Sequence, residues 1–494
     1  MDTTHSILRS AKAFFAGTLL SRLSGFLREI VVAAIFGSSP EIAAFMVSYR
    51  LANVFRRLLG EGNLQAGFVP HFSALKEEGG HYFRDVAFSM ALVLLAVVAL
   101  LEMVLWGSLH LVASDWTEIV ELTMWMVPGL FFVCLYALNS SLLQCRKKYF
   151  LPAAAPVMFN FIWIAAVLLL PGVRWLAIAV TAAFAGQWLM TVSEGWRLLS
   201  PKEWLKPKLF SPDFRTLLKP LALGIVGIGA VQFNSALDAI FARLADVQGP
   251  AYLWYAIRIQ QLPLALFGIA LSGALLPPLS RSQDPEHRKH LLQGALKHSA
   301  ALMIACTFGL FALGKPGVNL LFGHGHFSLA DVEETVGCLW GYGLGLIPSV
   351  FVLLLAAKYY AEKHYRLPTM ASLFAVLANI VLNAFFVFGL GWGAISIAIA
   401  TSLSAFLNVA ILGRGVFTLT FWRFATKMGV ACAVPAAAVL GMQVYLEPSR
   451  QLLTQLAHFG VLSGVYLTGL IALAWALGLS ELMDLVKRKR PEII

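Results

Sequence analysis

Charged residues are scarce in this sequence: Asp, Glu, Lys and Arg together make up only 13% of its 494 residues. Soluble domains of average composition carry about 25%. The hydrophobic fraction is correspondingly high, at 59%. This composition excludes a soluble globular protein, a disordered protein and a coiled coil. It predicts an all-α polytopic membrane protein.

Cysteine is also scarce, and its distribution excludes two further kinds of site. The five cysteines are scattered, mostly in apolar runs, without paired spacing, which argues against a disulfide framework and against a zinc site. We interpret them as small buried hydrophobic residues. They are Cys134, Cys145, Cys306, Cys338 and Cys432.

Long polar stretches are missing as well. The stretches outside the apolar segments, such as residues 199–213, are too short to fold alone. No nucleophile–base arrangement occurs in any sizeable soluble segment, so we expect a protein that is not an enzyme.

Near the N-terminus, Arg22 and Arg28 interrupt the first apolar stretch. We therefore interpret that stretch as an uncleaved first span and not as a signal peptide.

Apolar segments dominate what remains. Fourteen of them approach or exceed the roughly 20 residues that cross a bilayer core, which predicts fourteen transmembrane helices. They cover residues 10–36, 42–59, 86–111, 117–142, 151–170, 175–198, 214–243, 251–279, 293–314, 332–359, 367–388, 392–413, 424–446 and 454–480.

Basic residues follow the positive-inside rule along the chain. If the N-terminus is cytoplasmic, every inward connection is basic, as in residues 146–148, whereas the outward connections hold only Arg174, Lys315 and Arg450. Much of the net charge of +11 is therefore a topology signal. It predicts that both termini are cytoplasmic, and that the basic loops face membrane lipids and not nucleic acid.

An internal repeat relates the two halves of the chain. An arginine, a glycine and a proline recur with the same spacing in the second and eighth segments, and the fifth and sixth segments match the eleventh and twelfth. A shift of six spans preserves orientation, so the repeat is parallel, which is typical of transporters. We expect an N-lobe at 1–200, a C-lobe at 201–416, and two extra helices with a basic tail at 417–494. The recurring residues are Arg50, Gly60 and Pro70, then Arg258, Gly268 and Pro278.

Several charges lie inside the predicted spans, where they are costly and indicate function. Arg22, Arg28 and Arg258 lie too deep to reach the interface easily, whereas Arg57 near a span end is best interpreted as reaching the membrane surface. Arg22 and Glu29 are seven residues apart and therefore share a helix face. The alternative for Glu29 is that it only neutralises an arginine. The surplus of arginine favours an anionic substrate, and a lipid-linked pyrophosphate fits bidentate arginine chemistry.

Polar residues in the C-terminal half suggest a second site. Asn379 and Asn383 lie four residues apart on one helical face. With Thr401 and the buried acid Asp238 they form a candidate site for a monovalent cation. The alternative, which we favour, is hydrogen bonding between helices.

The N-terminal pattern resembles the MurJ (MviN) family of lipid II flippases, which belong to the multidrug/oligosaccharidyl-lipid/polysaccharide exporter superfamily. The residues that carry the resemblance run from Ser21-Arg22 to Arg28, through Ile35-Phe36-Gly37, Asn53, Arg56-Arg57 and Glu61-Gly62 to Phe68-Val69-Pro70, and the likeness continues through Tyr149 to Asn160, Tyr255 to Pro278 and Leu367 to Asn383.

The resemblance implies fourteen helices in two lobes around a central cavity, with the last two helices forming a groove for a polyprenyl tail. It also implies that the diphosphate contacts Arg22, Arg28, Arg56 and Arg258, accompanied by Ser21, with Glu29 in place of the family's usual Asp. Some members are thought to bind sodium in the C-lobe, near the candidate cation site.

Three positions depart from the family pattern, because Ala43, Ile257 and Gln261 replace usual acids. Fewer acids would then be available to release the substrate or to couple transport to an ion.

The sequence and the resemblance together predict a lipid II flippase that works by alternating access. We expect it in a bacterial cytoplasmic membrane, without a cofactor, with Na⁺, H⁺ or the membrane potential resetting the carrier, and with cell-wall synthesis enzymes as potential partners.

One alternative is another polyprenyl-linked glycan flippase or a drug antiporter, although an antiporter for cationic drugs would need acids in the cavity. A glycosyltransferase would need catalytic acids in a sizeable outward loop, and the outward loops are short. A non-transporting scaffold is a third class that only a functional assay separates.

Overall fold

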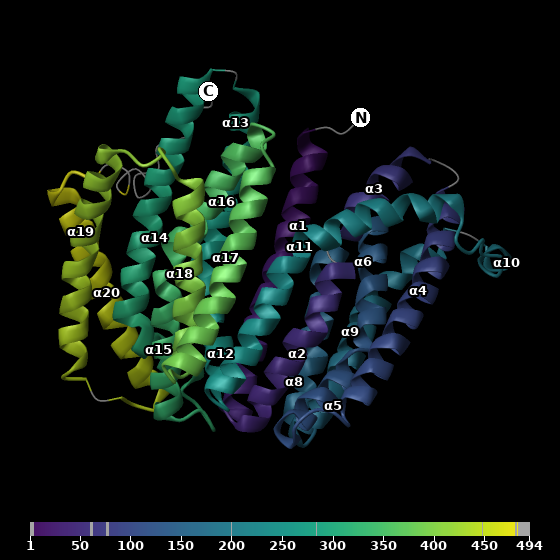
Figure 1. The fold of residues 1–494 in the computed structure, drawn as a ribbon, viewed down its shortest axis with the longest axis horizontal. Coiled ribbons are helices and arrows are strands. Elements are labelled where there is room, and N and C mark those ends of the chain that lie inside the picture. Colours follow the sequence, from purple (N-terminus) through teal and green to yellow (C-terminus); the bar gives the residue numbers. More distant parts are fainter. Residues whose placement is uncertain are drawn as a thin grey trace. The chain divides into compact units, whose positions relative to one another are not determined.

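The computed structural model describes residues 4–59, 63–75, 79–198, 200–282, 284–446, 448–479 and 482, and all regular secondary structure in these ranges is helical (Figure 1). The chain divides into two compact units, Met1–Ile240 and Phe241–Ile494. The predicted all-α class is therefore confirmed. The division into an N-lobe, a C-lobe and an added helix pair stays a prediction.

The first unit is a bundle in which α1 packs on α7 and α8, α2 packs on α5, and α9 packs on both α6 and α8. The last helix, α11, runs past residue 240 into the second unit. The helices are α1 (Thr4–Phe36), α2 (Pro40–Leu59), α3 (Asn63–Ala74), α4 (Gly79–Ser108), α5 (Ser114–Met126), α6 (Gly129–Cys145), α7 (Phe150–Ala154), α8 (Pro156–Leu169), α9 (Gly172–Trp196), α10 (Pro201–Trp204) and α11 (Pro212–Ala245).

The second unit is a bundle in which α14 packs on α15, α16, α19 and α20, and α18 packs on α15, α16 and α17. Its elements are α12 (Gly249–Pro263), the π-helix η2 (Leu264–Gly268), α13 (Ile269–Arg281), α14 (Pro285–Phe322), α15 (Leu329–Leu344), α16 (Leu346–Ala361), α17 (Arg366–Ala384), the π-helix η3 (Phe385–Gly389), α18 (Ile395–Leu412), α19 (Leu419–Gln443) and α20 (Leu452–Ala476).

Eleven helical stretches in the described residues are long and apolar enough to cross a membrane, and they coincide with eleven of the predicted segments. The chain is therefore a multi-pass membrane protein. The other three segments, 10–36, 42–59 and 214–243, correspond to α1, α2 and α11. The number fourteen stays a prediction.

Two predicted spans are interrupted at corresponding places. The fourth is divided into α5 and α6 just before Gly129, and the tenth is divided into α15 and α16 at Gly345. A proline lies beside each break, Pro128 in one and Pro348 in the other, and proline removes a helical hydrogen bond. The short helices α3 and α10 lie outside every predicted span, because periodicity over a full bilayer length does not detect them.

The packing inside each unit supports the parallel repeat. In the first unit α2 packs on α5, α3 on α6, and α8 on α9; in the second unit α12 packs on α15, α13 on α16, and α17 on α18. These are the same neighbours after a shift of six predicted spans. The helix pair α2 and α3 thus corresponds to the pair α12 and α13.

The turns that follow α6 and α16 have the same backbone conformation and the same hydrogen bond. Lys147 and Lys363 adopt the left-handed backbone conformation, with φ of 61° and 60°. In both turns the amide after the lysine donates to the carbonyl five residues earlier, at 2.8 Å. This is a Schellman cap, in which glycine is the usual residue at the left-handed position. The chain therefore has lysine where glycine would be less strained.

We expect Lys147→Gly and Lys363→Gly to be more stable than the matched Lys147→Ala and Lys363→Ala by about 1 kcal/mol each, because only a residue with a Cβ is strained at positive φ. Both members of each pair lose the same charge, so topology effects cancel. Thermal unfolding in detergent measures the difference. Equal stability of a glycine and an alanine variant would show that the left-handed turn is not maintained.

Candidate functional site

Arg28 of α1 is buried inside the first unit, surrounded by Glu29, Asn160, Phe159 and Trp163, which we call the arginine pocket. It is 7% exposed, and the neighbouring Glu29 is 3% exposed. A guanidinium nitrogen of Arg28 forms an ion pair with Glu29 Oε1, and Arg28 Nη1 donates to Asn160 Oδ1 of α8 at 3.1 Å. Burying a charge is costly unless it is paired and hydrogen-bonded. The pair and the amide provide this compensation.

Asn160 ties this pocket to the backbone of α1. Its Nδ2 donates to Ser24 Oγ at 2.9 Å and to the Ser21 carbonyl at 3.2 Å. Small residues on this face of α1 allow the close approach: a Cβ at Gly17 would lie 2.8 Å from Ala153 Cβ of α7. Small residues spaced in this way are a common helix-packing surface in membranes. Ser21, predicted to accompany the diphosphate, therefore contributes its carbonyl to this packing contact.

Aromatic rings form another wall of the pocket. The Arg28 Cζ lies 4.4 Å from the centre of the Trp163 ring and 5.7 Å from that of Phe159. Phe159 contacts Phe184 with ring centres 4.6 Å apart, and Arg56 Cζ of α2 lies 6.0 Å from Phe184. Cation–π contact holds a guanidinium without consuming its hydrogen-bond donors. The two arginines thus stand at opposite ends of one aromatic row.

The Nε–H of Arg28 is an unused donor. It is buried, and no hydrogen-bond partner for it occurs in the described part of the chain. Buried donors without partners are rare and call for an explanation such as a ligand or water. A phosphate oxygen is an acceptor of the kind that arginine binds strongly.

Arg22 and Glu29 lie on the unbroken helix α1, where their spacing of seven residues puts them on one face, but their surroundings differ. Arg22 is exposed in the first unit whereas Glu29 is buried. The helix periodicity is right, but seven residues amount to about 10 Å along the axis. Asn160, Phe159 and Trp163 contact Arg28, the residue directly before Glu29, and in the described part of the chain their hydrogen bonds and ring contacts do not include the Arg22 side chain. Arg57 is exposed, and its Nη1 donates to Gln232 Oε1 of α11 at 3.3 Å.

Arg258 of α12 lies in the second unit. It is partly buried, and its Cζ lies 4.4 Å from the centre of the Trp254 ring, one helical turn earlier. The ring fixes the direction of the side chain by cation–π contact. Of the departures from the family pattern nearby, Ile257 is partly buried and Gln261 is exposed. Ala43 in α2 is fully buried.

The residues of the candidate cation site are found in different units. Asn379 and Asn383 of α17 and Thr401 of α18 are connected in the second unit: Asn383 Nδ2 donates to Asn379 Oδ1 at 3.1 Å, and Asn379 Nδ2 donates to Thr401 Oγ1 at 3.4 Å. Asp238 is buried in α11 and falls in the first unit. The amide chain has the form of the interhelical hydrogen bonding that the sequence analysis favoured. Coordination of a cation stays a prediction.

Two contributors to the arginine pocket had no predicted role. Asn160 belongs to the residues that carry the family resemblance but has no predicted role, and the sequence predicts nothing for Trp163. The signal that was available is that Asn160 is a polar residue inside an apolar span, where it needs a partner. Both the exposed and the buried side of α8 are apolar in the sequence, so the hydrophobic periodicity does not predict which side Trp163 occupies.

Solved structures with a similar fold are transporters. A structure described as the lipid II flippase MurJ in an inward closed conformation aligns with a TM-score of 0.74 and 24% identity, covering 93% of this chain and 99% of that chain. An inward-facing multidrug resistance MATE family transporter of the MOP superfamily aligns with a TM-score of 0.60 and 15% identity, covering 85% and 98%. The chain therefore shares the polytopic helical fold of these structures.

Sequence comparison gives the family. A model of the lipid II flippase MurJ family matches residues 32–458. A Chlamydia muridarum protein described as a probable lipid II flippase MurJ is 33% identical over 530 residues, covering 98% of this chain and 97% of the relative. A Vibrio cholerae protein with the same description is 30% identical over 473 residues, covering 88% and 89%. The chain belongs to the lipid II flippase MurJ family.

Proposed function

We propose that this protein moves lipid II from the cytoplasmic to the outer leaflet of a bacterial cytoplasmic membrane by alternating access. The single observation that carries the proposal within the structure is Arg28: a buried guanidinium with an unused donor, in a chain that belongs to the MurJ family over most of its length. Arginine is the side chain suited to a diphosphate, because its planar fork binds two phosphate oxygens at once.

The proposed diphosphate contacts are Arg22, Arg28 and Arg56 in the first unit and Arg258 in the second. Ser21 and Glu29 accompany them. Trp163 and Trp254 orient two of these guanidinium groups by cation–π contact. The rings hold the cations without neutralising them, because an aromatic ring carries no net charge. Substrate binding must favour the occluded state over the open one for the equilibrium to shift.

The energy source is a separate part of the proposal. We propose that an ion or the membrane potential resets the empty carrier. Asp238, Asn379, Asn383 and Thr401 are the residues to test for a monovalent cation. Among the described residues, no group of three or more His, Cys, Asp or Glu side chains is placed to hold a metal ion.

Depletion with complementation tests the function. A bacterium depleted of its own flippase is supplied with this protein, and lipid II is quantified on each face of the membrane. We expect lipid II to reappear on the outer face. If it stays inside at normal protein levels, the proposed substrate is wrong, and other polyprenyl-diphosphate glycans become the next substrates to assay.

A further inference from the structure

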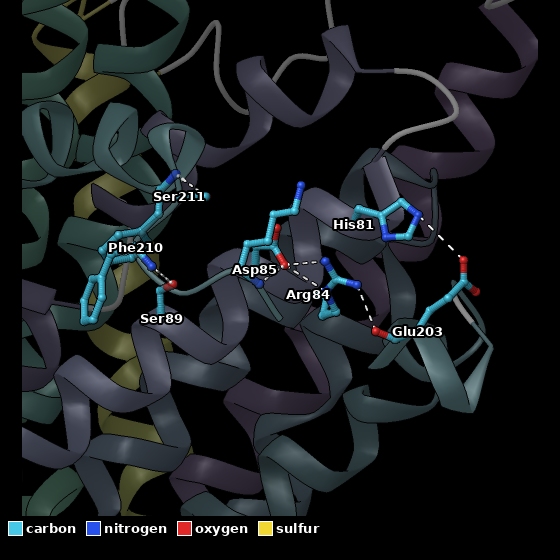
Figure 2. A network of polar contacts seen from close by, with 9 residues as sticks. His81, Arg84, Asp85, Ser89, Glu203, Phe210 and Ser211 are labelled. Carbon is cyan, nitrogen blue, oxygen red and sulfur yellow. Dashed lines mark hydrogen bonds and ion pairs between the residues drawn. The ribbon is translucent and has the colours of Figure 1, made fainter. Parts of the chain in front are cut away.

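The connection between α9 and α11 is fixed to α4 by buried charges (Figure 2). Arg84 and Asp85 of α4 are 4% and 7% exposed, and Arg84 Nη2 lies 2.7 Å from Asp85 Oδ1. Arg84 Nη1 donates to the Glu203 carbonyl at 2.8 Å. A buried ion pair that also binds backbone holds its partner segment in one place, because release would leave a charge uncompensated.

The same network holds the far end of the connection. Asp85 Oδ1 accepts a hydrogen bond from the Lys208 backbone N–H at 2.9 Å, and Ser89 Oγ accepts one from the Phe210 N–H at 2.9 Å. The carboxylate of Glu203 caps the short helix α10 by accepting hydrogen bonds from Ser200, which lowers the pKa of Glu203 below its usual value. The connection is therefore an ordered element and not a loose linker.

This ordered element presents an unusual combination of exposed side chains. Residues 196–210 contain four cations and a single acid, Glu203, which is committed to the cap of α10. Large apolar side chains are exposed among them, with Leu205 at 82%, Leu209 at 49% and Phe210 at 43%. The exposed cations are Arg197, Lys202, Lys206 and Lys208.

An apolar pocket of about 260 Å³ lies against this segment. Its walls come from the first turns of α4, the last turns of α9, the middle of α6 and the end of α10. Tryptophan gathers at the boundary between lipid and water, and the pocket lies at the ends of two apolar spans. The aromatic lining residues are Phe83, Phe88, Phe131, Trp188, Trp196 and Trp204.

We propose that this pocket and the basic segment beside it form a binding site for one anionic phospholipid. An acyl chain enters the aromatic pocket, and the phosphate contacts the cations that flank Trp196 and Trp204, namely Arg197, Lys202 and Lys206. The apolar walls select a hydrocarbon chain, and the excess of cations over the one engaged carboxylate selects a negative headgroup. The Arg84–Asp85 pair fixes the position of this basic segment against α4. The site shares no residue with the proposed diphosphate contacts, so it can fail without affecting the proposed function.

Fluorescence quenching tests the site. The purified protein in detergent is titrated with phosphatidylglycerol or phosphatidylcholine whose acyl chains carry bromine, which quenches nearby tryptophan. We expect phosphatidylglycerol to reach half-maximal quenching at a concentration at least threefold lower than phosphatidylcholine. Trp204→Phe is expected to remove part of this quenching, and Trp422→Phe, on the exposed side of α19, is the matched control.

Two variants separate headgroup from chain. Lys202→Gln/Lys206→Gln is expected to abolish the preference for phosphatidylglycerol, whereas Arg423→Gln/Lys427→Gln, two exposed cations on α19, is expected to keep it. Ala91→Phe fills the pocket and is expected to weaken quenching by both lipids. Equal titrations for the two lipids, or equal effects of the two charge variants, would overturn the proposal. Absence of quenching by either lipid would also overturn it and would leave the pocket to a protein partner.

Discussion

Arg28→Met is expected to lower the free energy of unfolding by about 3–5 kcal/mol, because it leaves the Glu29 carboxylate buried without its cation. Transport of lipid II is expected to fall to background in the same variant. The two effects have different causes in our proposal. The first reflects the ion pair between Arg28 and Glu29, and the second reflects the lost contact with the diphosphate.

The double variant Arg28→Met/Glu29→Gln distinguishes these causes. Replacing both members of a buried ion pair by neutral residues of similar size is often nearly neutral for stability. We therefore expect the double variant to recover most of the thermal stability but none of the transport. Thermal unfolding in detergent and lipid II on the outer face are the two measurements. Full transport by the double variant would mean that Arg28 only balances Glu29.

Arg258→Ala is expected to lower transport strongly while changing stability only slightly. The side chain is partly buried and stacks on Trp254, so its removal should cost only about 0.5–1 kcal/mol of stability. Loss of one charge-assisted contact with phosphate, about 1.5–3 kcal/mol, should lower transport by roughly 10- to 150-fold.

Arg258→Lys and Arg281→Ala are the matched controls. Lysine keeps the charge but lacks the planar fork, so we expect transport between that of wild type and that of the alanine variant. Arg281 is exposed at the end of α13 and its loss should leave transport unchanged. Normal transport by Arg258→Ala at wild-type protein level would remove this residue from the proposed site.

The helical fold could be predicted because bilayer spans leave a strong compositional signal. Eleven of the predicted spans coincide with helical stretches that are long and apolar enough to cross a membrane, and the family that the motif residues indicated is confirmed. The breaks beside Pro128 and Pro348 could not be predicted, because a proline inside a span is compatible both with a kinked helix and with two separate helices. The turns at Lys147 and Lys363 were missed because lysine is not the residue usually found at positive φ.

The arginines could be predicted as functional, but their surroundings could not. Charge inside a span is visible in the sequence, whereas the partner that neutralises it depends on which helices pack together. The contact between Arg28 and Asn160 joins residues 132 positions apart. The difference between exposed Arg22 and buried Glu29 likewise depends on where α8 crosses α1, which one-helix periodicity does not contain.

The position of the Glu29 carboxylate directly beside Arg28 has a consequence for how substrate binds to and leaves the site. A phosphate that binds more of the Arg28 guanidinium than its free Nε–H must compete with the Glu29 carboxylate, so the protein carries its own tethered competitor for the cargo. A competitor that never diffuses away keeps affinity moderate and speeds departure once the outer leaflet is reached, which a carrier needs more than it needs tight capture. Turnover, and not retention, is the property that this pair of neighbouring residues favours.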